Sequence, residues 1–244
     1  LANIYLHKSD TIFNNNSLFY RRYVDDMLFI VKKEDESKIN SVVENELEPL
    51  GLKIHKNDDK TCFVPITDSF DYLGYSITMP VVSIKKKNVE KYISSISSLF
   101  SLYNNYGAKI YNTDDEELAI RLFIDDVNEK ITGSLSENRR YGWIFYFLEM
   151  NDLKLLYTID IIIRDKFCSR IKNKKAATII TSSIKKLVKA YYHAKYCQKC
   201  GYINNYDLYD SISKKLQFLL DRGFIKKDEE NTLSAQEIEN RFKI

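Results

Sequence analysis

The sequence predicts an α+β protein, in which a β-rich part up to residue 84 precedes a longer and almost entirely helical part. Short apolar runs separated by turn residues fill the first part, whereas apolar residues recur at helical spacing after residue 85. Only seven glycines and three prolines occur among 244 residues, which favours long helices. A hydrophobic content of 44% with 29% charged residues is typical of a globular protein with a core. No apolar run is long enough to cross a bilayer, so no membrane partner is expected.

The first part is expected to consist of strands around one amphipathic helix. Residues 1–10 should be the end of a helix, followed by a polar connection over 10–17. In residues 34–50 apolar residues recur near the 3.6-residue period, and Gly51 is a typical helix end. The strands are predicted at 18–24, 27–32, 52–55, 61–65, 70–75 and 77–84.

The second part is expected to be helical throughout. Gly133 should end the second of its helices, and Arg139 lies at the start of an aromatic-rich third one. Ser234 and Glu237 have the spacing of a capping box, which predicts a last helix near the C-terminus. The helices before this last one are predicted at 86–106, 114–132, 137–150, 152–171, 176–196 and 205–222.

Two adjacent carboxylates, Asp25 and Asp26, interrupt an aromatic and aliphatic run that otherwise suits a β-hairpin. Aspartate is depleted from strands, and an ionised carboxylate is costly to bury unless it is paired or bound to a metal. The pair is therefore expected at the turn between two strands, where it would face a divalent cation. Mg²⁺ suits such a site because it takes one or two carboxylates together with substrate phosphates. The alternative is a solvated turn that uses aspartate for its backbone tolerance.

Four segments in order make the chain resemble the reverse transcriptases. Tyr23-Val-Asp-Asp26 is similar to the family's Tyr-x-Asp-Asp box. Before it, Leu1-Ala-Asn-Ile-Tyr-Leu-His7 together with Asp10 resembles the end of the region that follows a Pro-Gln-Gly turn in this family. Gly51-Leu-Lys-Ile-His55, followed by Lys60-Thr61, resembles the next motif, and Phe70-Asp-Tyr-Leu-Gly-Tyr75 resembles the primer-grip hairpin. The resemblance covers some 75 residues. It points to the bacterial lineage of group II intron, retron and defence-associated enzymes.

The resemblance implies an architecture in three parts. Residues 1–84 would form the C-terminal part of a ferredoxin-like polymerase palm, residues 85–150 a thumb-like helical region, and residues 151–244 a C-terminal helical region. The family's first catalytic aspartate lies upstream of the Pro-Gln-Gly turn, and no residue here matches it. We therefore expect the fingers and that motif to lie outside this chain, and residues 1–244 alone to be inactive.

The resemblance also assigns roles to individual residues. Asp25 and Asp26 would be catalytic and would hold two Mg²⁺ ions, with a third carboxylate ligand from outside this chain. Lys60 would act on the pyrophosphate leaving group, or would be an ordinary strand-edge lysine. The residues expected at the primer and substrate are Tyr23, Val24, Leu73 and Gly74, although the last two also suit a plain hairpin.

Two basic clusters are candidates for nucleic-acid contact. They are Lys85, Lys86 and Lys87, and Arg139 with Arg140. Lysine and arginine side chains that follow a phosphate backbone supply most of the affinity for nucleic acid. The alternative is a solvated helix face, since the net charge of the whole chain is only +3.

Cys197-Gln-Lys-Cys200 is the only paired cysteine motif in the chain. A structural zinc needs four ligands, and no second Cys-x-x-Cys motif occurs, so zinc is not expected. We expect instead a half-buried pair of thiols at the end of a helix, in a reducing bacterial cytoplasm.

The sequence thus predicts an RNA-directed DNA polymerase that joins deoxynucleotides by two-metal phosphoryl transfer. Its expected partners are an RNA template or non-coding RNA, a DNA primer and product, deoxynucleotides, and a protein partner or second copy of the chain. Segments such as Arg140-Tyr-Gly-Trp143 are similar to those of bacterial antiviral reverse transcriptases, with type 3 as the candidate subclass. Two alternatives stay open: a non-catalytic nucleic-acid or partner-binding module derived from a polymerase, and a polymerase that extends without a nucleic-acid template.

Overall fold

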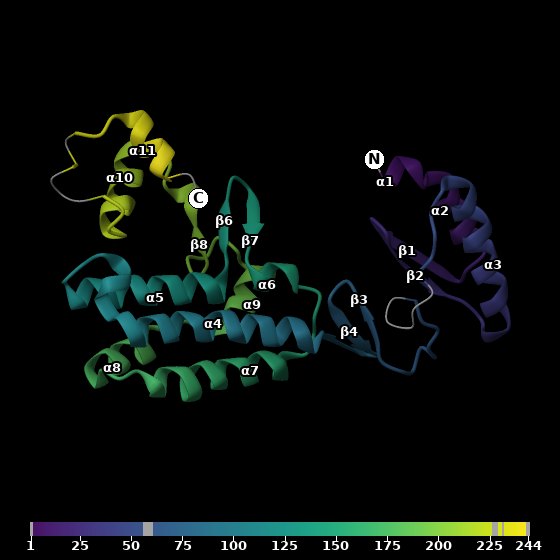
Figure 1. The fold of residues 1–244 in the computed structure, drawn as a ribbon, viewed down its shortest axis with the longest axis horizontal. Coiled ribbons are helices and arrows are strands. Elements are labelled where there is room, and N and C mark those ends of the chain that lie inside the picture. The colour runs from purple at the N-terminus through teal and green to yellow at the C-terminus, as the bar shows by residue number, and fades with distance from the viewer. Residues whose placement is uncertain (1, 56–60, 226–228, 231, 243–244) are drawn as a thin grey trace. The chain divides into compact units, whose positions relative to one another are not determined.

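The computed structural model describes residues 2–55, 61–225, 229–230 and 232–242. These residues are a mixture of helices and small sheets, in agreement with the predicted α+β class. The chain divides into two compact units, residues 1–85 and residues 86–244 (Figure 1). Within the described ranges no helix is both long and apolar enough to span a bilayer.

Among its described residues, the first unit contains a two-stranded and a three-stranded antiparallel sheet and three α-helices. Strands β1 and β2 pair from Phe19↔Ile30 to Tyr23↔Asp26, and β3, β4 and β5 follow one another in the second sheet. The elements are α1 (Ala2–Tyr5), α2 (His7–Asn15), β1 (Phe19–Tyr23), β2 (Asp26–Ile30), α3 (Glu36–Leu47), β3 (Phe70–Tyr72), β4 (Tyr75–Thr78) and β5 (Val81–Ile84), with short 3₁₀ turns at Lys33–Asp35 and Glu48–Leu50.

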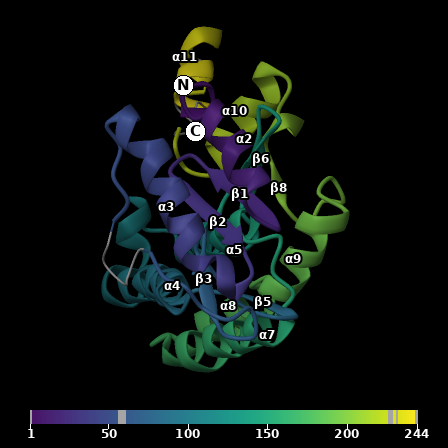
Figure 2. The same ribbon diagram turned by 90° about the vertical axis from the view of Figure 1, so that its right-hand side faces the viewer.

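Aromatic packing explains why the first helical region runs further than predicted. Residues 10–15 belong to α2 rather than to a polar connection, because Phe13 is fully buried on this helix. Its ring contacts Tyr20 of β1 and Phe29 of β2 edge-on, with centroids 5.5 and 5.6 Å away. Edge-to-face contacts at this separation are the favoured geometry of aromatic pairs. Figure 2 shows α2 and α3 beside the β1–β2 hairpin.

The amphipathic helix is confirmed. α3 buries Ile39, Val43 and Leu47 in the same core, and a 3₁₀ turn leads to Gly51 in the left-handed conformation at φ 71°. Glycine adopts a positive φ without the steric penalty that a Cβ brings, so it is the usual residue at this position.

Four of the predicted strands are wrong in part or in whole; the strand predicted at 70–75 is divided by the β3–β4 turn at Leu73 and Gly74. Residues 52–55 and 61–65 are not strands, and Phe63 and Val64 are 43% and 42% exposed. Alternation of apolar and polar residues indicates which face of a segment is apolar, but it does not supply a partner strand. The predicted strand 77–84 is interrupted between β4 and β5 at Met79-Pro80, because proline has no N–H to donate to a ladder.

The second unit packs its helices around a buried core and carries one small mixed sheet. Phe123 of α5 stacks on Tyr103 of α4 at 4.4 Å and meets Phe100 edge-on at 5.1 Å. The helices are α4 (Lys86–Tyr106), α5 (Glu116–Thr132), α6 (Trp143–Tyr146), α7 (Leu153–Ile161), α8 (Lys174–Ser183), α9 (Leu187–Tyr196), α10 (Ile212–Asp221) and α11 (Ala235–Phe242); the strands are β6 (Ser134–Ser136), β7 (Arg139–Tyr141) and β8 (Asn204–Asn205). A π-helical turn (Ile162–Phe167) and a 3₁₀ turn (Cys168–Arg170) extend α7, and further 3₁₀ turns lie at Gly107–Tyr111 and Tyr206–Leu208.

The helix predicted at 137–150 is wrong. Arg139 and Arg140 lie on β7, which pairs with β6, and the only α-helix in this stretch is the four-residue α6. β6 also pairs in parallel with β8, so the unit 86–244 joins the segments 85–150 and 151–244 in one sheet. The predicted helix 205–222 likewise begins as β8 and a 3₁₀ turn before α10.

The helix predicted at 176–196 is divided into α8 and α9 by an extended segment. Asn128 holds this segment, since its side chain accepts from Lys185 N at 2.7 Å and donates to Ser183 O at 3.2 Å. The carboxylate of Asp160 accepts from the N–H groups of Leu187 and Val188 at 2.6 and 3.1 Å, and so caps α9 from another helix.

The predicted capping box near the C-terminus is confirmed. The backbone N–H and the hydroxyl of Ser234 donate to the carboxylate of Glu237 at 2.8 and 2.6 Å, and the hydroxyl accepts from Glu237 N at 3.3 Å. Leu219 of α10, Ile238 of α11 and Ile225, which follows α10, then form one buried cluster.

Candidate active site

The β1–β2 turn is one residue earlier than predicted. Tyr23 and Asp26 are the last paired residues, so Val24 and Asp25 form the two-residue turn and Asp26 opens β2. Val24 has a φ of 57° and Asp25 is not among the residues with positive φ. That combination is typical of a type II′ turn, whose first central residue is normally glycine. A β-branched residue there stores of the order of 1–3 kcal/mol of backbone strain.

Arg22 holds this turn in place. Its guanidinium donates to both carboxylate oxygens of Asp10, at 2.8 and 2.6 Å, and to the carbonyl oxygen of Val24 at 2.6 Å. Tyr20 donates its hydroxyl to the same carboxylate at 2.8 Å. The hydrogen bond from Arg22 is the main cause that lowers the pKa of Asp10 from its usual value, against the opposing effect of burial.

Sequence reasoning missed the role of Arg22. A signal was present, because Tyr20 and Arg22 are two residues apart on one strand and therefore share a face. The face of Tyr20 is buried, and the Arg22 side chain is only 5% exposed. A guanidinium on that face requires a carboxylate, and Asp10 supplies it from α2.

The two candidate metal ligands lie in solvent. Asp25 and Asp26 are exposed, and in the described part of the chain neither makes an ion pair. Tyr23 and Val24 beside them are 62% and 52% exposed. The turn therefore presents two neighbouring carboxylates without the desolvation cost that a buried strand would impose.

The β3–β4 turn lies in the same unit and is electrostatically coupled to Asp26. Leu73 and Gly74 occupy it with φ of 49° and 82°, and a type I′ turn requires positive φ at both positions. Burial, and after it the negative charge of Asp26, raises the pKa of Tyr72, the last residue of β3.

Lys85 supports that second turn. Its backbone N–H donates to Gly74 O at 3.0 Å, and its ammonium pairs with Asp71 at 2.9 Å. Lys86 makes a loose pair with Glu90 at 3.9 Å, while Lys87 makes no ion pair within the described ranges. The three lysines are therefore not equivalent.

The remaining predicted residues are distributed as follows. Arg139 and Arg140 are exposed on β7. Lys60 lies outside the described residues. Among the described residues no cluster of three or more His, Cys, Asp or Glu side chains could hold a metal ion. Asp25 and Asp26 can thus supply one side of a metal site, and Asp10 is occupied by Arg22.

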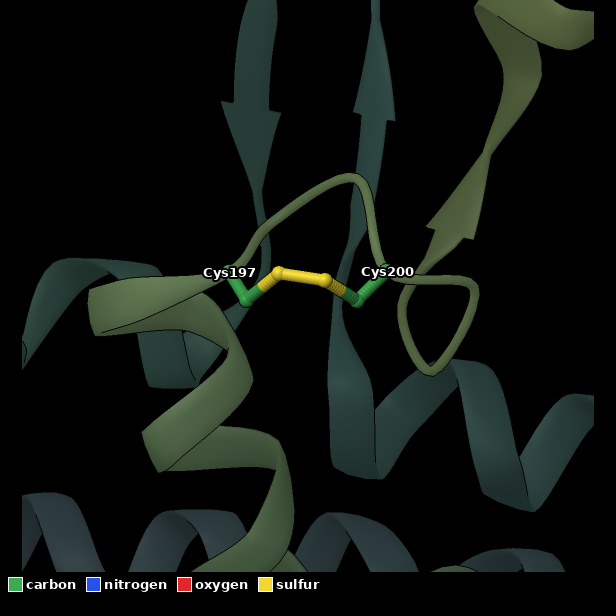
Figure 3. Close-up of a disulfide and its surroundings, with 2 residues drawn as sticks. All are labelled: Cys197 and Cys200. Atoms are coloured by element: carbon green, nitrogen blue, oxygen red, sulfur yellow. A yellow bond between two sulfur atoms is a disulfide. The ribbon is translucent and has the colours of Figure 1, made fainter.

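The prediction of a free thiol pair is wrong. Cys197 and Cys200 form a disulfide at the C-terminal end of α9, with their Cα atoms 5.5 Å apart (Figure 3). This separation lies within the usual range for disulfides. Cys62 and Cys168 are free, and burial raises the pKa of the Cys168 thiol.

No protein-family model matches the chain, and no curated protein or solved structure matches it either. What the chain does must therefore be inferred from its residues and their geometry.

Proposed function

We propose that the first unit is part of the catalytic palm of a reverse-transcriptase-type polymerase. One observation carries the proposal: Asp25 and Asp26 are adjacent, exposed and unpaired within the described ranges, on a turn whose backbone is strained at Val24. A solvated turn that served only to reverse the chain would have no need of a valine at positive φ. Strained backbone of this kind is concentrated at functional sites.

The residues present fit one side of a two-metal site. Carboxylate oxygens are the ligands that Mg²⁺ prefers, and both candidate carboxylates are open to a cation and to substrate phosphates. Two Mg²⁺ ions, when bound, would stabilise the charge on the attacking and leaving oxygens of an in-line displacement. Because Arg22 donates its hydrogen bonds to Asp10 and Val24, it orients the turn without neutralising the carboxylates of Asp25 and Asp26.

The other roles follow from this assignment. Tyr23 and Val24 would contact the end of the primer, and Leu73 with Gly74 would shape its path. Lys60 would act at the leaving group, and the phosphate-binding residues would be Lys85, Lys86, Lys87, Arg139 and Arg140. The template would be RNA and the setting bacterial antiviral defence in the cytoplasm.

The test is Mg²⁺-dependent incorporation of labelled deoxynucleotides by the full-length product of the gene. Asp25→Asn and Asp26→Asn should each abolish incorporation, because each removes a charged ligand while keeping the side-chain volume. Glu48→Gln is the matched control, since Glu48 is an exposed carboxylate in the same unit. Wild-type turnover in the Asp25→Asn protein would contradict the proposal.

A non-catalytic module is the second candidate, and one observation favours it. No third potential metal ligand accompanies Asp25 and Asp26 among the described residues. Under this alternative, the full-length protein would bind RNA or a protein partner and incorporate no nucleotide with any metal ion.

A polymerase without a nucleic-acid template would instead incorporate nucleotides after ribonuclease treatment, into products unrelated to any added strand.

A further inference from the structure

The second unit contains a groove with a volume of about 720 Å³. We call it the α4–α5 groove, and the residues that define it here are Lys91, Tyr92, Glu129, Lys130, Gly133 and Trp143. In Figure 1, α4 and α5 lie side by side, and the β6–β7 hairpin rises beside α6. A second, shallower hollow shares Lys91 and Ser95 with the groove and continues along α4 to Lys87. The volume is within the range of small-molecule sites, and the continuation makes the site elongated.

Exposed lysines line the groove and its continuation along α4. Lys87, Lys91 and Lys130 are exposed, and none of them makes an ion pair in the part of the chain that the structure describes. Lys87 and Lys91 are one helical turn apart, so they follow the same face of α4. An extended row of free ammonium groups favours a polyanion over a small neutral ligand.

Asp126 and Glu129, the carboxylates of the groove itself, are engaged by other side chains, whereas Glu90 of the shallower hollow makes only the loose pair with Lys86 at 3.9 Å. Asp126 accepts from Arg222 at 2.9 Å and from the Tyr111 hydroxyl at 2.8 Å. Glu129 accepts from the Tyr206 hydroxyl at 2.8 Å and lies 3.7 Å from the Arg222 guanidinium. The single positive charge of Arg222, which also lies 3.5 Å from Asp125, offsets part of this negative charge, and the two tyrosine hydroxyls hold the carboxylates by hydrogen bonds.

Aromatic rings form one wall of the groove. The Trp143 indole stacks on the Tyr92 ring, with centroids 4.2 Å apart and planes inclined by 12°. Tyr141 and Tyr146, which also line the groove, are 45% and 61% exposed. Exposed aromatic faces beside cations are the means by which proteins stack the bases of single-stranded nucleic acids.

The indole N–H of Trp143 is unsatisfied. Its Nε1 atom is buried and has no hydrogen-bond acceptor among the described residues. Buried polar groups in native proteins nearly always have a partner, so an orphaned donor on a groove-lining residue points to an acceptor that a ligand brings. A carbonyl oxygen or ring nitrogen of a nucleobase is such an acceptor.

We propose that the α4–α5 groove binds an unpaired segment of a nucleic-acid strand, with phosphates at Lys87, Lys91 and Lys130 and a base against Trp143. The proposal deepens the proposed function and rests on it for the identity of the polyanion. It concerns a site in the second unit, whereas the carboxylates of the β1–β2 turn belong to the first, and it requires no metal ion.

The experiment uses the fluorescence of Trp143, the only tryptophan of the chain. Oligouridylate and oligodeoxythymidylate are titrated into residues 1–244 without Mg²⁺ or nucleotides, beside an abasic strand of the same length. The two base-containing strands should quench the emission, and the quenching should saturate. Their relative affinities show whether RNA or DNA is the preferred ligand of the groove. The abasic strand should bind more weakly and leave the emission unchanged.

Substitutions locate the site. Lys91→Gln should reduce the slope of log affinity against log salt by about 0.7, which is the contribution of one phosphate contact on a single strand. The matched control is Lys154→Gln, because Lys154 is an exposed lysine of the same unit outside the groove, and its slope should equal that of the wild type. Trp143→Phe keeps the stack on Tyr92 but removes the N–H. Its binding is measured by the fluorescence anisotropy of a labelled strand, and this variant should bind the strand several-fold more weakly than the wild type.

Equal quenching by the abasic strand, or an equal loss of slope in Lys154→Gln, would overturn the groove assignment. So would unchanged emission in the presence of a base-containing strand that binds. A failure of the proposed function is separable, because Asp25→Asn should leave the quenching by residues 1–244 intact, while its effect on incorporation is measured separately in the assay of the proposed function. Folding of each variant is checked by circular dichroism before binding is compared.

Discussion

Arg22 donates a hydrogen bond of 2.6 Å to the carbonyl oxygen of Val24, the residue at positive φ in the β1–β2 turn. The same guanidinium is fixed to Asp10 of α2 through both carboxylate oxygens. A turn that is unfavourable by itself is thus tied to a helix by a charged, nearly buried side chain. This explains how the candidate ligands can be exposed and still be positioned.

Arg22→Ala should therefore destabilise the first unit by about 2 kcal/mol, the usual size of hydrogen bonds to a charged group. Hydrogen exchange of the β1 and β2 amides measures the effect, because the chain's single tryptophan lies in the other unit. Arg21→Ala is the control, since Arg21 is exposed on the opposite face of β1, where it stacks on Phe19 at 4.8 Å and donates only a local hydrogen bond of 2.7 Å to the carbonyl oxygen of Tyr20. Equal protection in both variants would mean that Arg22 does not hold the turn.

The stability of the first unit should depend on pH through Asp10. The pKa of this carboxyl is lowered in the folded state, mainly by the hydrogen bond from Arg22, so ionised Asp10 favours folding. The contribution is complete above the unfolded pKa of about 3.9, and it is lost as the pH falls through the lower folded value. Hydrogen exchange of the wild type and of Asp10→Asn is compared between about pH 6 and about pH 3. The difference in stability between the two proteins should shrink only at the acid end of this range. A difference that does not vary with pH would exclude Asp10 as the cause.

Sequence patterns predicted those helices and turns that are determined by residues within the same element. α4 has the bounds 86–106 that its periodicity indicated, and Gly51 ends its helix with the left-handed backbone that glycine suits. The hairpin around Leu73 and Gly74 was also predictable from turn chemistry. In each case the signal and the structure lie within one turn of the chain.

Patterns failed where a distant residue decides the outcome. Residues 137–150 have helical composition, but Glu137 and Asn138 form the turn of the β6–β7 hairpin at positive φ, and the backbones of Gly133 and Gly142 approach closely at its base. The break between α8 and α9 depends on Asn128 and Asp160, which are 27 to 57 positions away in sequence. The turn containing Asp25 was predictable, but its support by Asp10 depends on how a helix packs on a strand.

Gly142→Ala should destabilise the second unit and disorder the wall of the α4–α5 groove. A Cβ there would lie 2.6 Å from the Cα of Gly133, and the backbone of Gly142 has a φ of 110°. We expect a loss of about 3 kcal/mol, measured by denaturant unfolding with Trp143 fluorescence, because strain and overlap add. Gly201→Ala is matched, since Gly201 also has a positive φ but open space around it, and should lose only about 1 kcal/mol. Equal losses would show that the approach of the two glycines contributes nothing.

Val24→Asn tests whether the strain of the β1–β2 turn serves the site. Asparagine tolerates a positive φ far better than valine does, so the first unit should become more stable by about 1 kcal/mol, as judged by exchange of the β1 and β2 amides. Val64→Asn is the control, because Val64 is similarly exposed but its φ is not positive, and it should change stability little. If the strain helps to hold Asp25 and Asp26 for metal binding, the stabilised full-length protein should incorporate nucleotides more slowly than the wild type. A variant that is more stable and equally active would show that the strain has no part in catalysis, and one that is less stable would show that the valine is not strained.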